Sequence, residues 1–249
     1  MNGIAPPPEE LKMEIHKPRP FHNWREFLKE YAIIVIGVLT ALAAEQAAEW
    51  WHWQGEVKAA RQALREEIAA NDTLFARRVA LRACMDRQIS EADAIIGDLQ
   101  ARRPPRAYTT LHTGIEQIYN DSQWQSERAS QVLTHFPDRE LALMASHYAS
   151  LEGFRLWMDH EGFAWADLAV LRDPPAGLTG SDFLRLQASL GVARRMNALT
   201  ATRAASTLQI GAQLGLAPPA ADPERVEKFC TLSDREYNAW LRERPAGKP

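Results

Sequence analysis

The sequence predicts an all-α protein with one N-terminal transmembrane helix, followed by a long helix and an extracytoplasmic helical bundle. Four observations lead to this fold class. An apolar run near the N-terminus is bracketed by aromatic residues, and apolar positions after it recur at helical spacings. No segment alternates between apolar and polar residues as a half-exposed strand does, and the 13 glycines are too few for the frequent turns of a sandwich or barrel.

The composition is that of a folded protein, with 46% hydrophobic and 24% charged residues in 249. Residues 54–249 carry 24 Lys and Arg against 25 Asp and Glu. A domain so close to neutral lacks the basic surface of a nucleic-acid-binding protein, so we expect no nucleic-acid partner.

The predicted membrane anchor is the segment 24–53. Its centre, residues 31–44, is a run of 14 uncharged positions. Such a run alone is too short, because crossing the hydrocarbon of a bilayer takes roughly 20 apolar residues. Aromatic residues, which favour the two membrane interfaces, extend it on both sides. They are Trp24, Phe27, Tyr31, Trp50, Trp51 and Trp53.

The orientation of the anchor follows from its basic flanks. Three basic residues precede the apolar run closely, whereas none lies between Glu45 and Val57. The positive-inside rule then makes residues 1–23 a short cytoplasmic tail and residues 54–249 a soluble, all-helical domain outside the cytoplasm. In a Gram-negative bacterium, which the Ala- and Arg-rich composition fits, this means the inner membrane and the periplasm. The basic residues are Arg19, Arg25 and Lys29.

Other interpretations of the apolar run stay open. It has the length of a buried helix in a soluble protein, and Ala41-Leu42-Ala43 fits the small-x-small rule of a cleaved signal peptide. An interfacial helix would need a polar face that residues 31–44 lack. Gly37 and Ala41 lie on one side of the helix, where small residues let two membrane helices approach. The bilayer and a second copy of the chain are therefore the predicted partners, although alanine is abundant throughout the sequence.

A family resemblance rests on one N-terminal stretch. Its residues are Glu30, Ile36-Gly37-Val38-Leu39, Ala41, Trp50, Leu64, Glu67 and Asn71. Over residues 24–71 the chain resembles a family of uncharacterised bacterial single-pass membrane proteins, which have one tryptophan after the anchor where this chain has three. The resemblance implies the architecture and no activity.

The soluble domain begins with an apolar stripe over residues 54–101, which predicts one long helix or two joined end to end. Asn71 and Arg78 interrupt the stripe. A polar residue in such a seam can fix the register of a coiled coil, so Asn71 is a predicted oligomer contact. Alternatively, Asn71-Asp72-Thr73 caps a new helix. Four arginines form a basic side that we expect to be solvated. They are Arg77, Arg78, Arg82 and Arg87.

Further helices follow. Pro104-Pro105 ends the first region, and a short apolar pattern covers residues 111–119. Ser122 and Gln125 predict a capping box that opens the next helix. The later predicted helices run from Pro137-Asp138 to about Arg172 and from Asp182 to Leu214, with Thr179 or Ser181 as N-cap and Gly215 as C-cap, and two short pieces lie near Val226 and Tyr237.

Catalytic signals are weak. Glu161, near Trp157 and Trp165, is the only carboxylate that we single out, because apolar surroundings favour a protonated general acid. The more common alternative is a carboxylate that points into water or pairs with an arginine. No phosphate loop, dinucleotide fingerprint, nucleophile elbow or helical metal-ligand spacing occurs, so we predict no cofactor and no metal.

Cys84 and Cys230 are the only cysteines. In an oxidising compartment they are a candidate disulfide, whereas in the cytosol they would be unpaired core residues. The favoured function is a membrane-anchored interaction, scaffold or sensory module. One alternative is a membrane-tethered enzyme or small-ligand receptor with a pocket formed by Trp157, Glu161 and Trp165. Another is a soluble helical protein with a buried N-terminal helix.

Overall fold

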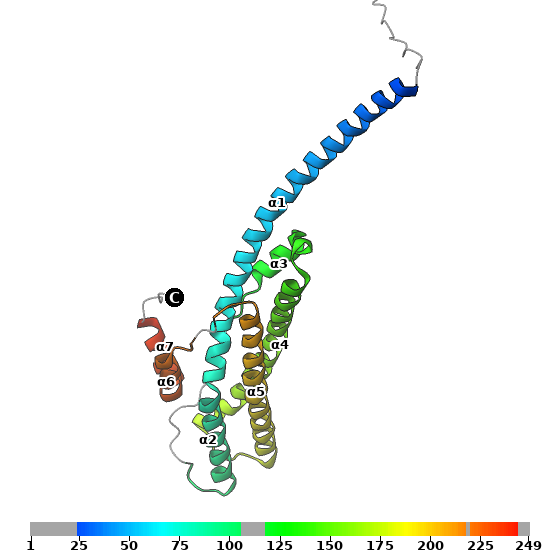
Figure 1. Ribbon diagram of the computed structural model, residues 1–249. Coiled ribbons are helices and arrows are strands. Elements are labelled where there is room, and N and C mark those ends of the chain that lie inside the picture. The colour runs from blue at the N-terminus through cyan, green and yellow to red at the C-terminus, as the bar shows by residue number, and fades with distance from the viewer. Residues whose placement is uncertain (1–23, 106–117, 218–219, 244–249) are drawn as a thin grey trace, which may run out of the picture. The chain divides into compact units, whose positions relative to one another are not determined.

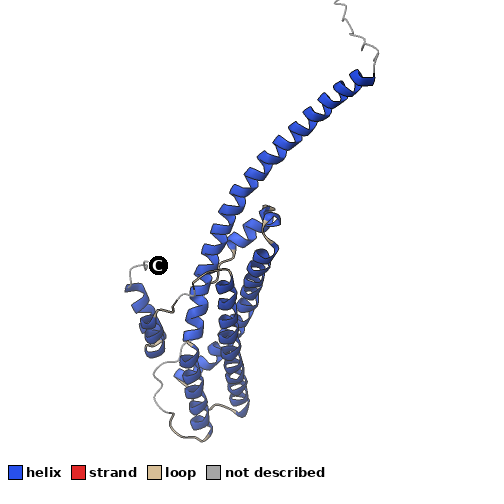
Figure 2. Cartoon of the chain, viewed as in Figure 1, coloured by secondary structure: helices blue, strands red, loops and turns tan. Residues whose placement is uncertain are grey.

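The computed structural model describes residues 24–105, 118–217 and 220–243. The chain divides into two units, Met1–His52 and Trp53–Pro249. Within the described ranges the chain forms helices and loops and no strand (Figure 2), which confirms the all-α prediction. The predicted pattern at 111–119 lies mostly outside the described residues.

The helices are labelled in Figure 1. The α-helices are α1 (Trp24–Ala80), α2 (Arg82–Gln100), α3 (Ser122–Ala129), α4 (Asp138–Leu168), α5 (Gly180–Gln213), α6 (Pro223–Thr231) and α7 (Asp234–Glu243), and two short 3-10 helices are η1 (Val132–His135) and η2 (Ala169–Arg172). In the unit Trp53–Pro249, α4 packs along α5, and α2 packs against α5 (Figure 1).

The predicted helical region 54–101 is two helices, and the break lies at Leu81. Asn71-Asp72-Thr73 therefore starts no new helix; it lies inside α1. The break is mild, because the N–H of Leu81 still bonds the carbonyl of Arg77 and the carbonyl of Leu81 accepts from Met85, both at 3.0 Å. Leu81 itself is fully buried. Burial of this side chain holds the junction against the bundle core.

Two apolar clusters fill the bundle. One joins α1 residues such as Leu64 and Phe75 to the first half of α4, represented by Leu151. The other joins α2 to the second half of α4 and the first half of α5, and it includes Trp165 and Tyr237. The long helices of this unit thus contribute to the interior with one apolar stripe each, which in α1 begins at Val57, as the helical spacing of the apolar residues predicts.

The ends of α5 confirm the capping predictions. Thr179 and Asp182 form a reciprocal capping box at the N-terminus. At the C-terminus Gly215 has φ +76°, and the N–H of Leu216 bonds the carbonyl of Gly211 at 3.1 Å. This is the Schellman arrangement, in which a left-handed residue suits glycine.

One helix end and one predicted cap differ from the prediction. The helix from Asp138 ends at Leu168, and its last predicted turn is the separate helix η2. Helix α3 does begin at Ser122, but its flanking residue Asp121 makes no side-chain capping bond. The predicted capping box of Ser122 and Gln125 is therefore wrong, because a side chain from another helix occupies that place.

Candidate functional site

Helix α1 presents four buried polar side chains to the bundle, which we call the α1 polar row: Glu67, Asn71, Asp72 and Arg78. All are at most 6% exposed. Burying a polar group without a partner costs roughly 1–3 kcal/mol by mutational data. In this row each residue has a partner on a different part of the chain, so the row determines how α1 packs against the rest of its unit.

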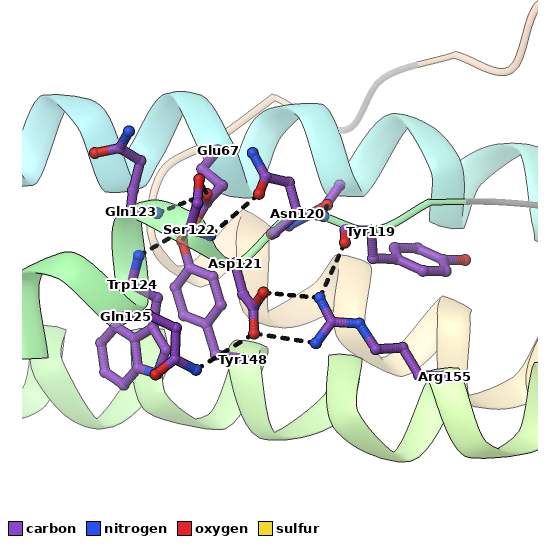
Figure 3. A network of polar contacts seen from close by, with 11 residues as sticks. Glu67, Tyr119, Asn120, Asp121, Ser122, Gln123, Trp124, Gln125, Tyr148 and Arg155 are labelled. Atoms are coloured by element: carbon purple, nitrogen blue, oxygen red, sulfur yellow. Dashed lines mark hydrogen bonds and ion pairs between the residues drawn. The ribbon is translucent and has the colours of Figure 1, made fainter.

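Glu67 supplies the N-cap of α3 from a distance (Figure 3). Its carboxylate accepts hydrogen bonds from the backbone N–H of Gln123 at 2.9 Å and of Trp124 at 3.3 Å. The hydroxyl of Tyr148 on α4 donates to the same carboxylate at 2.7 Å. Burial, and then the bond to Glu67, raise the pKa of Tyr148. A negative charge at this helix end also suits the helix dipole.

Asn71 binds the loop that leads into α3. Its amide nitrogen donates to the carbonyl of Asn120 at 2.6 Å, and its oxygen accepts from the N–H of Asn120 at 2.9 Å. This two-point pairing uses both ends of the side chain, which is 1% exposed. Asn71 is therefore turned into its own bundle, and its contact with a second copy of the chain stays a prediction.

The same loop is held from the other side by α4. Arg155 donates to Asp121 through two nitrogens, at 2.8 and 3.0 Å, and to the carbonyl of Tyr119 at 2.9 Å (Figure 3). These bonds lower the pKa of Asp121. Residues 119–124 are thus fixed between α1 and α4 by polar contacts as well as by the stacking of Tyr119 on Phe75, whose ring centroids lie 4.9 Å apart.

Asp72 pairs with His147 of α4, with 2.9 Å between Oδ1 and Nε2. Both side chains are at most 2% exposed. The other carboxylate oxygen of Asp72 lies against Gly211 of α5, where an added Cβ would collide with it. The absence of a side chain at Gly211 therefore allows α1 and α5 to approach at this level.

Arg78 is completely buried, contrary to the predicted solvated face. Its Nη2 donates to both carboxylate oxygens of Glu161 at 2.9 Å, and its Nε donates to Thr200 at 2.8 Å. Burial raises the pKa of Glu161 and lowers the pKa of Arg78, and the charge of each partner opposes these shifts. The pair joins α1, α4 and α5.

The predicted pocket around Glu161 is closed. Glu161 is 1% exposed and Trp165 is fully buried, and Arg78 occupies the space beside the carboxylate. Trp157, one turn before Glu161 on α4, is only partly buried, and the guanidinium of Arg203 lies 5.8 Å from its ring centre. The pairing with an arginine is thus the correct alternative for Glu161, and the enzyme or receptor interpretation loses its named pocket.

A groove of about 350 Å³ is found elsewhere, where the end of α4 meets the start of α5. The carboxylate of Asp167 in this groove already accepts from Arg185 at 2.6 Å and from Ser189 at 2.8 Å. Within the described residues no group of three or more His, Cys, Asp or Glu side chains is placed to hold a metal ion.

Helix α1 has an apolar window long enough to cross a membrane, and none of that window is buried. An interpretation as the buried helix of a soluble protein requires the reverse. Gly37 and Ala41 are exposed, and an added Cβ at Gly37 would meet no atom within 4 Å. Nothing within the chain covers this predicted helix-contact surface in the described residues.

Cys84 of α2 and Cys230 of α6 are placed together as a disulfide pair, with Cα atoms 5.7 Å apart. This is a normal separation for the bond.

Comparisons of the chain with known protein families, with characterised proteins and with solved structures found no match.

Sequence reasoning did not identify Glu67, Asp72 or His147 as interior residues. Only the interruption of the apolar stripe at Asn71 and Arg78 gave a signal. The partner of Asn71 follows it by 49 residues and the partner of Arg78 follows it by 83 residues. No local sequence pattern connects positions so far apart.

Proposed function

We propose that the protein is a single-pass membrane protein whose helical unit, Trp53–Pro249, is a non-enzymatic interaction or sensory module. The observation that carries this proposal is the apolar, wholly exposed window in α1. Exposed apolar surface of this length is costly in water and favourable in lipid. The resemblance over residues 24–71 to single-pass membrane proteins supports the same architecture.

A non-enzymatic role is supported by how the buried polar residues are used. The carboxylates of Glu67, Asp72 and Glu161 are all engaged by groups of the same chain. Catalytic carboxylates need access to a substrate. In this unit the buried charges hold helices in register, a role suited to a module that presents a fixed surface to a partner.

We further propose that the N-terminus is cytoplasmic and the helical unit extracytoplasmic. The basic flank before the apolar run supports this orientation. The placement of Cys84 beside Cys230 is consistent with it, since disulfides persist in oxidising compartments and are rare in the cytosol.

The test is fractionation followed by thiol labelling in bacterial cells that express the full chain. We expect the protein to resist carbonate extraction from membranes, and an impermeant maleimide to label it only after reduction. Val38→Arg, in the middle of the apolar run, should release it from the membrane, whereas Ala70→Arg on the exposed side of the same helix should not. Recovery of the wild-type chain in the soluble fraction would overturn the anchor. Labelling only after lysis would overturn the orientation.

A further inference from the structure

The two C-terminal helices contact the chain on both sides of the α1–α2 break. Before the break, Arg77 donates from Nη2 to the hydroxyl of Tyr237 on α7 at 2.8 Å, and its guanidinium lies 6.0 Å from the ring centre of Phe229 on α6. After the break, Cys84 is paired with Cys230 of α6. The α6–α7 hairpin, residues 223–243, therefore bridges the junction at Leu81.

The hairpin is a small element. Its helices have 9 and 10 residues, below the roughly 12–15 residues at which isolated helices become even marginally stable in water. It is seated by Phe229 and Tyr237, which are 3% and 5% exposed and pack edge to face. The ion pair of Arg172 with Asp234 is partly exposed, and such pairs contribute little. Partly buried side chains of the hairpin also pack against the same core, namely Val226, Leu232, Trp240 and Leu241. The covalent bond adds to these apolar contacts, and it is the link that a reductant can break.

The two sulfur-bearing residues differ in access. Cys84 is 3% exposed, whereas Cys230 is half-buried. An external thiolate would therefore attack the sulfur of Cys230, with the Cys84 thiolate as the leaving group. Access to one sulfur of a pair is what makes a disulfide exchangeable without prior unfolding.

We propose that the Cys84–Cys230 bond is a redox latch, which fixes the α6–α7 hairpin over the α1–α2 junction when closed and frees the hairpin and the junction when a dithiol reduces it. The reductant's first thiolate forms a mixed disulfide with Cys230, and Cys84 leaves and takes up a proton. The second thiol of the reductant then attacks the reductant's first sulfur, which is bonded to Cys230 in the mixed disulfide. This closes the disulfide of the reductant and releases Cys230 as a thiol. Two electrons pass from the dithiol, which becomes a disulfide, to the pair of cysteines.

This inference goes beyond the proposed function and depends only on residues of the unit Trp53–Pro249. It can therefore fail while the anchor stands, and it can hold if the anchor is wrong. Its functional meaning is that the chain's helical unit has two states, a rigid oxidised one and a reduced one in which the buried face around Leu81 is uncovered.

The test is hydrogen exchange of the full chain in detergent micelles, measured by mass spectrometry before and after treatment with dithiothreitol. We expect peptides covering residues 223–243 and 78–86 to exchange at least about ten-fold faster after reduction, while peptides from α4 and α5 stay protected. Reoxidation should restore the slow exchange. Unchanged exchange in 223–243 would overturn the latch, and so would faster exchange throughout the bundle, because the bond would then hold the whole unit.

Two variants separate the effect of the disulfide from that of the non-covalent contacts of the hairpin. Cys230→Ser should reproduce the reduced pattern and respond no further to dithiothreitol. Tyr237→Phe removes the hydrogen bond from Arg77 and keeps the disulfide, so its oxidised form should stay closed at both peptides. If Cys230→Ser does not fold, reduction of the wild-type chain followed by reoxidation still decides the question, since both states then come from one sample.

Discussion

Arg78 on α1 donates from one nitrogen to both carboxylate oxygens of Glu161 on α4, and the two side chains are 0% and 1% exposed. A charge pair so fully removed from water is costly to assemble, and it is far costlier to split. The pair therefore adds more to the uniqueness of the helix packing than to its net stability.

Removing one partner of this pair should destabilise the bundle strongly. We expect Arg78→Met to lower the free energy of unfolding by about 3–5 kcal/mol, because Glu161 would remain as an unpaired buried charge. The double variant Arg78→Met/Glu161→Met should recover most of the loss. Urea titration of the full chain in detergent measures both. A comparison is Arg194→Met, in an exposed pair with Asp93, which should cost at most about 1 kcal/mol. If Arg78→Met and Arg194→Met lowered the free energy of unfolding equally, this account would be contradicted.

Loss of the distant cap should loosen α3. In Glu67→Ala the N–H groups of Gln123 and Trp124 and the hydroxyl of Tyr148 lose their acceptor. Missing caps typically cost about 0.5–2 kcal/mol. We expect faster hydrogen exchange of the amides in 122–125. The neighbouring exposed residue provides the control, since Glu66→Ala removes a carboxylate of the same helix that bonds only an exposed glutamine within α1.

Asn71→Leu separates the internal role of this residue from an oligomeric one. The substitution leaves both polar groups of the Asn120 backbone without their partner, so the melting temperature should fall, by the equivalent of roughly 1–3 kcal/mol. The molar mass of the detergent-solubilised chain, measured by light scattering, should not change. A lower mass with an unchanged melting temperature would instead support Asn71 as an oligomer contact.

Two glycines in the interior of α5 should respond in opposite directions to alanine. Gly211→Ala places a methyl group against the Asp72 carboxylate and so disturbs its bond to His147. Gly191→Ala meets no atom within 4 Å and gains about 1 kcal/mol of helix propensity. We expect the melting temperature to fall in the first variant and to rise slightly in the second. Matching shifts of the same sign would rule out close contact at Gly211.

Acid should weaken the hold on residues 119–124. The hydrogen bonds from Arg155 keep the pKa of Asp121 below its usual value. A carboxyl group with a lowered pKa in the folded state stabilises fully above its unfolded pKa of about 3.9 and loses that contribution as pH falls through the folded value. The drop in melting temperature between about pH 5 and pH 3 should therefore be smaller in Asp121→Asn than in the wild type. An equal drop in the two proteins would contradict this account.

Local chemistry predicted much of the fold from the sequence. The two ends of α5 follow from Thr179, Asp182 and Gly215, since caps and left-handed turns depend on residues within four positions of each other. The start of α4 at Asp138 follows from the preceding proline in the same way.

What failed depended on residues far apart in the chain. Ser122 and Gln125 have the spacing of a capping box, but Glu67, brought in by α1, takes the place of the local cap. The break at Leu81 could not be predicted from a neighbouring proline or glycine, because the sequence has neither there. Arg78 looked like part of a solvated basic side because its counter-charge, Glu161, lies on another helix. Interior charges can be assigned only when the partner is known.

The spacing of the two cysteines also sets an order of events during synthesis. Cys230 follows Cys84 by 146 residues. At about 5–20 residues per second, a ribosome needs roughly 7–30 s to add them. Throughout that interval Cys84 is a thiol whose partner Cys230 has not been synthesised. Oxidation at this stage can link Cys84 to a cysteine of another protein. Correct pairing thus favours late oxidation, after α2, α4 and α5 have come together and enclosed Cys84.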